Sequence, residues 1–459
     1  MNNLEKPDDS NPTTWSRRSF LGTAAAGSLL GATKQGTGTV EGKKGSSDLP
    51  STADQVQESR ATTALQIGPE LNLGERRVVA SGEYGYDTIQ DAWEHAASGD
   101  IIFVHGSYDA QEAGEEFPIV LDQSQKEVVL TGGHPSGSVI DARHAPDKNV
   151  IEVLGRGQND YRNKAIVQKL KIRGGNIGLR IRAAPYSTYK DLVFFQTGSH
   201  GVSVETYNDA SGAFKGSFGI NFRSCVAWSC RGVGFRLSSE ARPHSTSFYG
   251  CHALWNGYYE GNNAPGVLLR GYASRWNGGT IQNNGSYGID ARGGGSQTVY
   301  GTYFEGNGAS SEFPHGIYVS KSPGLSIDSC YFNGHFSREV TNGLRDGHRA
   351  IAVVDAKGVD IRNTTFRNYT DAFLYGRNTL DVDIHRPSHD ALDETEFLSD
   401  ASEFQRLRSD GMVQEADLRD TDGLYRGDMG IHNGDGEALW GPAVWNGREW
   451  ISVMEPTIV

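Results

Sequence analysis

The sequence predicts an all-β protein, a parallel β-helix of stacked coils, on the basis of two series of short repeats. In the first series, a glycine opens a five-residue segment in which apolar and polar residues alternate. These segments are GLRIR at 178–182, GVSVE at 201–205, GVGFR at 232–236, GVLLR at 266–270, GIDAR at 288–292 and GIYVS at 316–320. Alternation with a period of two indicates a strand with one buried face. The starts are separated by 23, 31, 34, 22 and 28 residues, which indicates a repeat architecture.

A second strand series runs between the glycine-led segments. Its members alternate in the same way and are followed by turns rich in asparagine and glycine. They are residues 220–225, 247–251, 299–304, 327–332 and 361–366. No helical periodicity separates the two series, and a propeller blade would need about 40–45 residues per repeat. The spacing therefore favours one short set of strands per coil, which is the plan of a parallel β-helix.

Residues 1–33 are predicted to be an export signal. Arg17 and Arg18 precede Phe20 and an apolar stretch of small residues that runs to Ala32. This order resembles a twin-arginine (Tat) signal. The stretch is too short to span a bilayer, and no later stretch is apolar for long enough. We therefore expect an extracellular or cell-surface protein with no transmembrane span in the mature chain, and a flexible linker over residues 34–63.

The first elements after the linker are a helix and a buried strand. Residues 86–97, YDTIQDAWEHAA, have the pattern of an amphipathic helix, and residues 101–104, IIFV, have that of a buried strand. This order resembles the capping helix and first coil of the right-handed parallel β-helix superfamily of pectate-lyase-like proteins. The resemblance covers roughly residues 78–380 and implies a right-handed solenoid over residues 64–380. The superfamily includes lyases, hydrolases, epimerases, viral tailspikes and adhesins, so the fold alone does not choose a function.

The last eighty residues differ from the repeats. Residues 381–420 are strongly acidic and are predicted to be a linker or cap, with residues 393–408 as a candidate short helix. Residues 421–459 are predicted to form a small β module. Apolar alternation on both sides of Asn446-Gly447 indicates a hairpin there.

The overall charge bears on the class of partner. The chain has 459 residues, 56 acidic side chains, 43 basic ones and a net charge of −13. A general nucleic-acid binder needs a basic surface, so no nucleic-acid partner is expected. An acidic surplus with few lysines suits a salt-rich, halophilic setting, where screening weakens self-repulsion.

The outward positions of the glycine-led segments carry many arginines. Counted from the glycine, the second and fourth residues point inward, and the third and fifth point outward. The fifth position is occupied by Arg182, Glu205, Arg236, Arg270, Arg292 and Ser320. The third is occupied by Arg180, Ser203, Gly234, Leu268, Asp290 and Tyr318. Stacked arginines repel one another unless anions lie between them, so we expect an acidic polysaccharide as partner. The alternative is that the arginines pair with Glu205, Asp209, Glu240 and Asp290 on a solvated face.

The candidate catalytic group is Asp290 and Arg292 on one strand, with Arg270 one coil away. Arg182, Glu205, Arg236 and Tyr318 are the candidate substrate-binding residues. The resemblance implies a polysaccharide lyase that uses an arginine or lysine base, often with Ca²⁺, which leaves Ca²⁺ open as a cofactor. No acidic triplet falls on neighbouring coils, so no metal ligand is predicted. The first hypothesis is a lyase-like enzyme, and the alternative is a non-catalytic glycan-binding surface protein or adhesin, similar to a tailspike.

The inward positions predict the core. Cys225, Cys251 and Cys330 share one repeat position with two threonines and are expected to be small buried residues without a disulfide. Phe304, Phe332 and Phe366 are expected to stack inside the solenoid. The asparagines at 307, 333 and 368 are expected at corners of the coils.

Overall fold

The structure of the protein is a computed structural model. The structure describes residues 76–79, 85–157, 164–208, 214–237, 243–258, 262–308, 315–334, 348–369, 372–390, 396–399, 407–409, 429–432, 441–445 and 450–452. The predicted export signal and linker at 1–63 lie outside these residues, so both remain predictions. No helix in the described ranges is long and apolar enough to cross a membrane.

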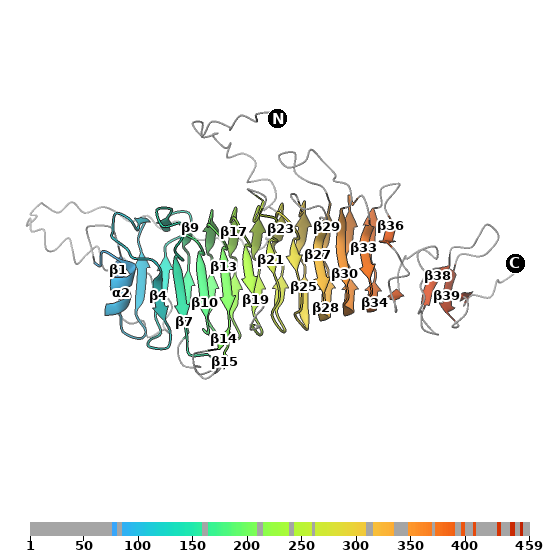
Figure 1. Cartoon of the computed structure of the whole chain (residues 1–459), viewed down its shortest axis with the longest axis horizontal. Coiled ribbons are helices and arrows are strands. Elements are labelled where there is room, and N and C mark those ends of the chain that lie inside the picture. The colour runs from blue at the N-terminus through green and yellow to red at the C-terminus, as the bar shows by residue number, and fades with distance from the viewer. Residues whose placement is uncertain are drawn as a thin grey trace, which may run out of the picture. The chain divides into compact units, whose positions relative to one another are not determined.

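The described residues form a right-handed parallel β-helix whose coils each contribute strands to three sheets (Figure 1). Sheet A consists of β1 (Arg76–Val79), β2 (Ile101–Val104), β5 (Val129–Gly132), β8 (Ile166–Gln168), β11 (Thr188–Lys190), β16 (Asn221–Arg223), β19 (Ser247–Tyr249), β22 (Arg275–Asn277), β25 (Gln297–Tyr300), β28 (Pro323–Asp328), β31 (Lys357–Arg362), β34 (Leu380–His385) and β37 (Leu407–Ser409). Sheet B consists of β3 (Ser107–Asp109), β6 (Val139–Ala142), β9 (Lys171–Gly174), β12 (Val193–Phe195), β17 (Val226–Trp228), β20 (His252–Leu254), β23 (Thr280–Gln282), β26 (Tyr303–Glu305), β29 (Tyr331–Asn333), β32 (Thr365–Arg367) and β35 (Ser388–Asp390). Sheet C consists of β4 (Ile119–Asp122), β7 (Ile151–Leu154), β10 (Leu179–Arg182), β13 (Val202–Glu205), β18 (Phe235–Leu237), β21 (Val267–Leu268), β24 (Ile289–Asp290), β27 (His315–Ser320), β30 (Arg349–Val354), β33 (Ala372–Arg377) and β36 (Glu396–Ser399).

Smaller elements lie outside these sheets. A short antiparallel pair, β14 (Tyr207–Asn208) and β15 (Phe214–Lys215), projects from the coils. The three strands β38 (Met429–His432), β39 (Gly441–Trp445) and β40 (Trp450–Ser452) form an antiparallel sheet. The pairing of β39 with β40 agrees with the predicted hairpin, while its Asn446-Gly447 turn lies outside the described residues.

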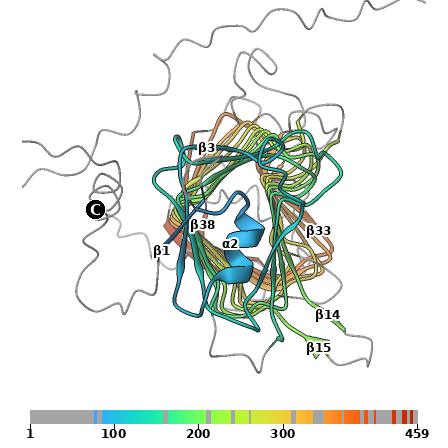
Figure 2. The same ribbon diagram turned by 90° about the vertical axis from the view of Figure 1, so that its left-hand side faces the viewer.

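Helix α2 (Ile89–His95) lies across the N-terminal mouth of the solenoid, as Figure 2 shows, and contacts β1, β2 and β4. It is shorter than the predicted 86–97, because the Thr88 side chain accepts a hydrogen bond from the Asp91 amide and caps the helix there. The buried Glu115 carboxylate accepts bonds from the Ile89 and Gln90 amides. The capping helix predicted for this end of the solenoid is therefore present.

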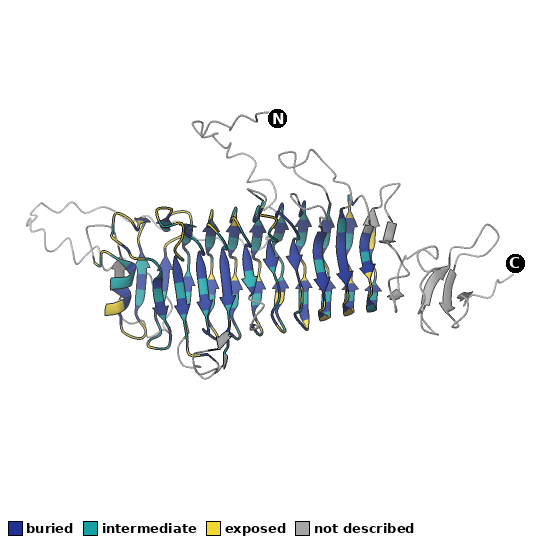
Figure 3. Cartoon of the chain, viewed as in Figure 1, coloured by how far each residue is buried: buried dark blue, intermediate teal, exposed yellow. Residues whose placement is uncertain are grey.

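The core fills the interior of the coils, and Figure 3 shows buried residues along the coils that it colours by burial. The predicted phenylalanine stack is confirmed: the rings of Phe304 and Phe332 lie 4.4 Å apart, and those of Phe332 and Phe366 lie 5.4 Å apart. All four cysteines are buried and free, as expected of small core residues.

The register of one strand differs from the prediction. Val202 of β13 pairs with Phe235 of β18, and Phe235 pairs with Val267. The opening glycine of this coil is therefore Gly234 rather than Gly232. A Cβ atom added at Gly201 would lie 2.7 Å from the Gly234 carbonyl oxygen, and one at Gly234 would lie 2.8 Å from that of Gly266. Only glycine allows this close approach between coils.

The solenoid also continues beyond the predicted end at residue 380. Strands β34 and β35 extend sheets A and B, and β36 and β37 fall within the range predicted to be a short helix. The helix expected at 393–408 is thus wrong where the structure describes that range.

Candidate functional site

The outer face of sheet C carries the charged residues singled out in the sequence. On its N-terminal part, Arg180 lies between two carboxylates, with Nη1 3.2 Å from Glu152 and Nη2 2.9 Å from Glu205. The guanidinium of Arg236 lies 3.8 Å from Glu205 and donates to the hydroxyl of Ser203 at 3.2 Å. This group balances two positive charges with two negative ones.

A second group on the same face has more positive than negative charge. The carboxylate of Asp290 is fully buried and accepts bonds from Arg270 Nη2 at 2.9 Å and from Arg292 Nε at 2.9 Å. The Arg292 amide donates to the same carboxylate at 3.1 Å. The hydrogen bonds to Asp290 raise the pKa of Arg292, so this side chain stays protonated. Two guanidinium groups therefore share one carboxylate, and 47% of the Arg292 side chain is exposed.

Aromatic rings lie beside this second group. The guanidinium of Arg292 lies over the ring of Tyr318 at 5.6 Å. The ring of Tyr287 stacks on Tyr318 at 4.7 Å, and His315 stacks on Tyr287 at 5.6 Å. Burial raises the pKa of Tyr287, which keeps its phenol protonated. The outer face thus combines cations with flat ring surfaces.

Three further residues extend this surface and were not predicted. Arg349 of β30 lies over the ring of Tyr375 of β33 at 3.9 Å, and Arg377 ends β33 with an exposed side chain. Sequence reasoning missed them because these strands do not open with the glycine that marks the other coils. The segment from Tyr375 to Arg377 nevertheless closes on an arginine, as GVLLR and GIDAR do.

The structure brings only part of the predicted site together. Arg270, Asp290, Arg292 and Tyr318 form one cluster. Because of the register correction, Arg236 aligns with Ser203 and Leu268 in the third-position column, not in the fifth as predicted. Arg182 aligns with Glu205, in the N-terminal part of the face. The predicted fifth-position column of arginines is therefore interrupted. The alternative prediction, that the arginines pair with carboxylates, holds for Arg180 and Arg236 with Glu205 and for Arg270 and Arg292 with Asp290. The other two predicted partners, Asp209 and Glu240, lie outside the described residues.

No group of three or more histidine, cysteine, aspartate or glutamate side chains gathers in the described part of the chain in a way that could hold a metal ion. Asp290, the one acid of the cluster, is already bonded to two arginines.

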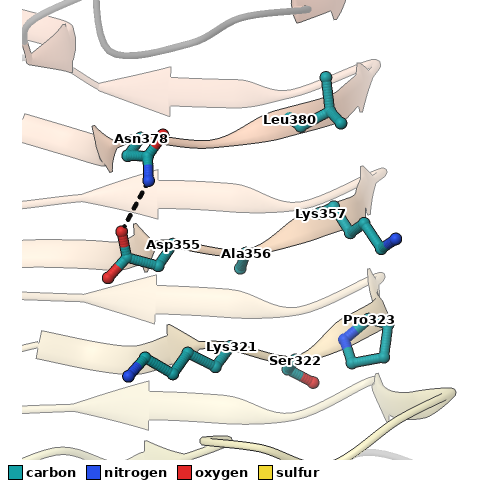
Figure 4. A pocket seen from close by; sticks show the side chains of 8 residues that line it. All are labelled: Lys321, Ser322, Pro323, Asp355, Ala356, Lys357, Asn378 and Leu380. Atoms are coloured by element: carbon teal, nitrogen blue, oxygen red, sulfur yellow. Dashed lines mark hydrogen bonds between the residues drawn. The ribbon is translucent and has the colours of Figure 1, made fainter.

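A hollow of about 340 Å³ lies at the corner between sheets C and A, just beyond Ser320 (Figure 4). It is lined by Lys321, Ser322, Pro323, Asp355, Ala356, Lys357, Asn378 and Leu380. Asn378 Nδ2 donates to Asp355 at 2.9 Å, and the amines of Lys321 and Lys357 point to opposite sides. The two lysines therefore do not converge on one anionic group.

His200 lies beside the group formed by Arg180, Arg236, Glu152 and Glu205, and its pKa is shifted there. Its Nδ1 accepts a hydrogen bond from the Val233 amide at 3.2 Å. Burial, followed by the charge of Arg236, lowers the pKa of His200 to about 4. The imidazole is therefore neutral at physiological pH.

We expect this histidine to make the fold sensitive to mild acid. In the unfolded chain it titrates near its ordinary value of about 6.5. Its stabilising contribution is complete above that pH and is lost as pH falls from about 6.5 towards 4, because the unfolded state binds the extra proton. The loss is about 1–3 kcal/mol after a discount for partial exposure. The test compares the wild type with His200→Asn, which keeps a hydrogen-bond acceptor, by chemical denaturation near pH 7 and near pH 4.5. Between these two pH values the variant should lose less stability than the wild type. Equal losses in the two proteins would contradict this.

The three sheets and their stacked register define this chain as a right-handed parallel β-helix protein. No family model matches it, and no curated protein matches it. Among solved structures it is similar to an alginate lyase from Paenibacillus sp. str. FPU-7, with 11% identity over 67% of this chain and 94% of that chain, and a TM-score of 0.45. It is also similar to the catalytic unit of a thermostable GH87 α-1,3-glucanase from Streptomyces thermodiastaticus strain HF3-3, with 13% identity over 80% and 72% of the two chains and a TM-score of 0.44. Tailspike protein 3 of bacteriophage CBA120 shows 12% identity over 79% and 65%, with a TM-score of 0.44. Similarities this distant do not bear on activity.

Proposed function

We propose that this protein binds an acidic polysaccharide along the outer face of sheet C. The observation that carries the proposal is the charge of this face between β21 and β33, where the described residues of the strands and their ends include four arginines and one aspartate. They are Arg270, Arg292, Arg349 and Arg377, with Asp290. We call the strip formed by these five residues, Tyr287, Tyr318 and Tyr375 the sheet C strip.

The chemistry of the strip suits an extended anionic sugar chain. Neighbouring coils are about 4.8 Å apart, so cations on successive coils can meet successive charges of a repeating polymer. Guanidinium groups bind carboxylate or sulfate oxygens with paired, charge-assisted hydrogen bonds. Tyrosine rings offer flat apolar faces with a polar edge, which suit the faces and hydroxyls of sugar rings. An extracellular location by twin-arginine export and a salt-rich setting are part of the same proposal.

Lyase-like cleavage is the second candidate. In β-elimination, a base removes the proton at carbon 5 of a uronate, the bond from carbon 4 to the glycosidic oxygen breaks, and an acid protonates that oxygen. In such a reaction Arg292 would neutralise the uronate carboxylate, and the phenol of Tyr287, whose pKa is raised, would serve as the acid. Neither group is suited to remove the proton, since both are held protonated, and His315 is only 4% exposed. The sheet C strip therefore supports binding more directly than cleavage.

Replacing Arg292 with alanine should weaken binding to acidic polysaccharides by roughly 10- to 100-fold, because one charge-assisted contact is removed. Stability should fall less than when Asp290 itself is replaced, since Asp290 keeps Arg270 and the backbone amide of residue 292 as partners. Calorimetry with polygalacturonate, dextran sulfate and neutral dextran would measure this effect. Arg367→Ala, an exposed arginine that ends β32 on sheet B, is the matched control. Equal affinity of both variants for every acidic polymer would overturn the proposal.

The same samples distinguish binding from cleavage. Incubation with polygalacturonate, with and without Ca²⁺, should give no rise in the ultraviolet absorbance of unsaturated uronates if the protein only binds. A rise that Arg292→Ala abolishes would favour the lyase.

A further inference from the structure

The outer face of sheet A carries a second aligned set of side chains. Across β16, β19, β22 and β25 the last residues of the strands are in register. They are, in order, Arg223, Tyr249, Asn277 and Tyr300. In the adjoining outward column the same strands contribute Asn221, Ser247, Arg275 and Thr298. We call these eight residues the sheet A strip.

The two tyrosines of this strip serve no purpose in the core. The interior positions of these strands are filled by Phe222, Phe248 and Trp276, whose rings lie 4.9 Å and 5.0 Å apart in sequence order. Tyr249 is 39% exposed and Tyr300 is 49% exposed. They lie two coils apart, or roughly 10 Å, with the amide of Asn277 between them. Flat rings at this separation with hydrogen-bonding groups between them suit alternate sugar units of one chain.

The arginines of the strip also differ from those of sheet C. Neither Arg223 nor Arg275 forms an ion pair with any carboxylate in the part of the chain that the structure describes. Arg223 instead lies over the ring of Tyr249 at 5.6 Å. On sheet C, by contrast, Arg180, Arg270 and Arg292 each bond a carboxylate. Within the described residues, an anion that binds Arg223 or Arg275 therefore displaces no carboxylate from either guanidinium group.

We propose that the sheet A strip is a second binding track for a segment of acidic polysaccharide that runs along the solenoid axis. The ligand class rests on the proposed function, but the residues are entirely different and face another side of the coils. Arg223 and Arg275 bind the acidic groups, and Tyr249 and Tyr300 stack on sugar rings. Two tracks on one rigid solenoid would let the protein hold two chains, or two parts of one chain, at the same time.

A second copy of this chain is the competing occupant. Further along the outer face of sheet A, Asp328, Asp360 and Asp383 provide negative charge that could meet the arginines of another copy. Asp360 is already paired with Arg362 at 2.9 Å, which reduces that complementarity. The alternation of rings and amides on the strip favours sugar as the occupant.

Two double variants test the track, namely Tyr249→Ala with Tyr300→Ala, and Arg223→Gln with Arg275→Gln. The control is Tyr186→Ala, which removes a tyrosine that is 39% exposed at the corner before β11. Calorimetry with short oligogalacturonates should show two binding events per wild-type chain and one in each double variant. Retention on long polygalacturonate should fall roughly tenfold as avidity is lost. The control should behave as the wild type.

The results also separate this inference from the proposed function. If Arg292→Ala removes the only binding event and the double variants change nothing, the sheet A track is overturned and the proposed function stands. If the double variants remove the only event and Arg292→Ala changes nothing, the sheet C proposal fails and the sheet A track stands. If sedimentation shows a wild-type dimer that the arginine double variant dissociates, with sugar binding unchanged, the strip is an interface between copies and the track is overturned.

Discussion

Replacing Asn284 with alanine should lower the free energy of unfolding by about 3–5 kcal/mol. Asn284 is fully buried in a ladder of asparagines at the corner between sheets B and C. Its Oδ1 accepts bonds from the amide of Asn256 at 3.0 Å and from the side chain of Asn256 at 3.1 Å. Its Nδ2 donates to the Ala253 carbonyl at 3.0 Å and to Asn307 Oδ1 at 2.8 Å. Alanine would leave these four buried groups without this partner.

Guanidinium denaturation followed by circular dichroism would measure the effect. The control is Asn283→Gly, the adjacent buried asparagine whose side-chain atoms have no hydrogen-bond partner and whose φ is 52°. Glycine tolerates that backbone conformation, so the control should change stability by less than about 1 kcal/mol. A similar loss in the two variants would show that the ladder contributes nothing beyond packing.

The ladder also shows what sequence reasoning could and could not reach. Asn307 was expected at a corner, but Asn256 and Asn284 were not connected to it, although the spacing of all three follows the coils. The alternation of apolar residues can be seen within a single short segment of the sequence. It predicted the fold because every coil repeats the same alternation. The partner of a corner side chain lies one coil away, at a sequence distance set by loops of varying length.

The same reasoning explains the error at β18. Both Gly232 and Gly234 can begin an alternating segment, and nothing within GVGFR chooses between them. Gly234 is the glycine that approaches the coils on either side closely, and it therefore opens the strand. This contact can be recognised only when the stacking of the coils is known. A shift of two residues keeps the inward and outward faces, so the core prediction survived while Arg236 moved to another column.

For the candidate site, the sequence indicated which side chains point outward but not what they meet. Glu152 comes from a strand that has no opening glycine, so its bond to Arg180 was not predicted. The sheet A strip was not predicted, because the pattern of its strands is dominated by their buried residues. Its outward tyrosines become informative only when the register aligns Tyr249 with Asn277 and Asn277 with Tyr300.

Converting Asp290 to asparagine should lower the free energy of unfolding by about 2–4 kcal/mol. The substitution preserves shape and one acceptor oxygen for the Arg292 amide, so the loss reports the charge. Without the negative charge of Asp290, the guanidinium groups of Arg270 and Arg292 repel each other. The carboxamide that replaces the carboxylate also accepts fewer hydrogen bonds from them. The estimate lies below that for a fully buried ion pair because 21% of the Arg270 side chain and 47% of the Arg292 side chain remain exposed.

Asp360→Asn is the matched control, since Asp360 also bonds an arginine two residues later on an outer face, but 25% of its side chain is exposed. This more exposed pair should contribute little to stability, because solvent screens its charges. Sulfate should restore much of the stability of Asp290→Asn and little of that of Asp360→Asn, because only the first variant leaves two adjacent guanidinium groups facing one missing anion. Denaturation of both variants at equal ionic strength in sulfate and in chloride separates specific occupancy from screening. If chloride restored stability as well as sulfate did, the two arginines would not form an anion site, and the sheet C strip would lose the group on which its proposed function depends.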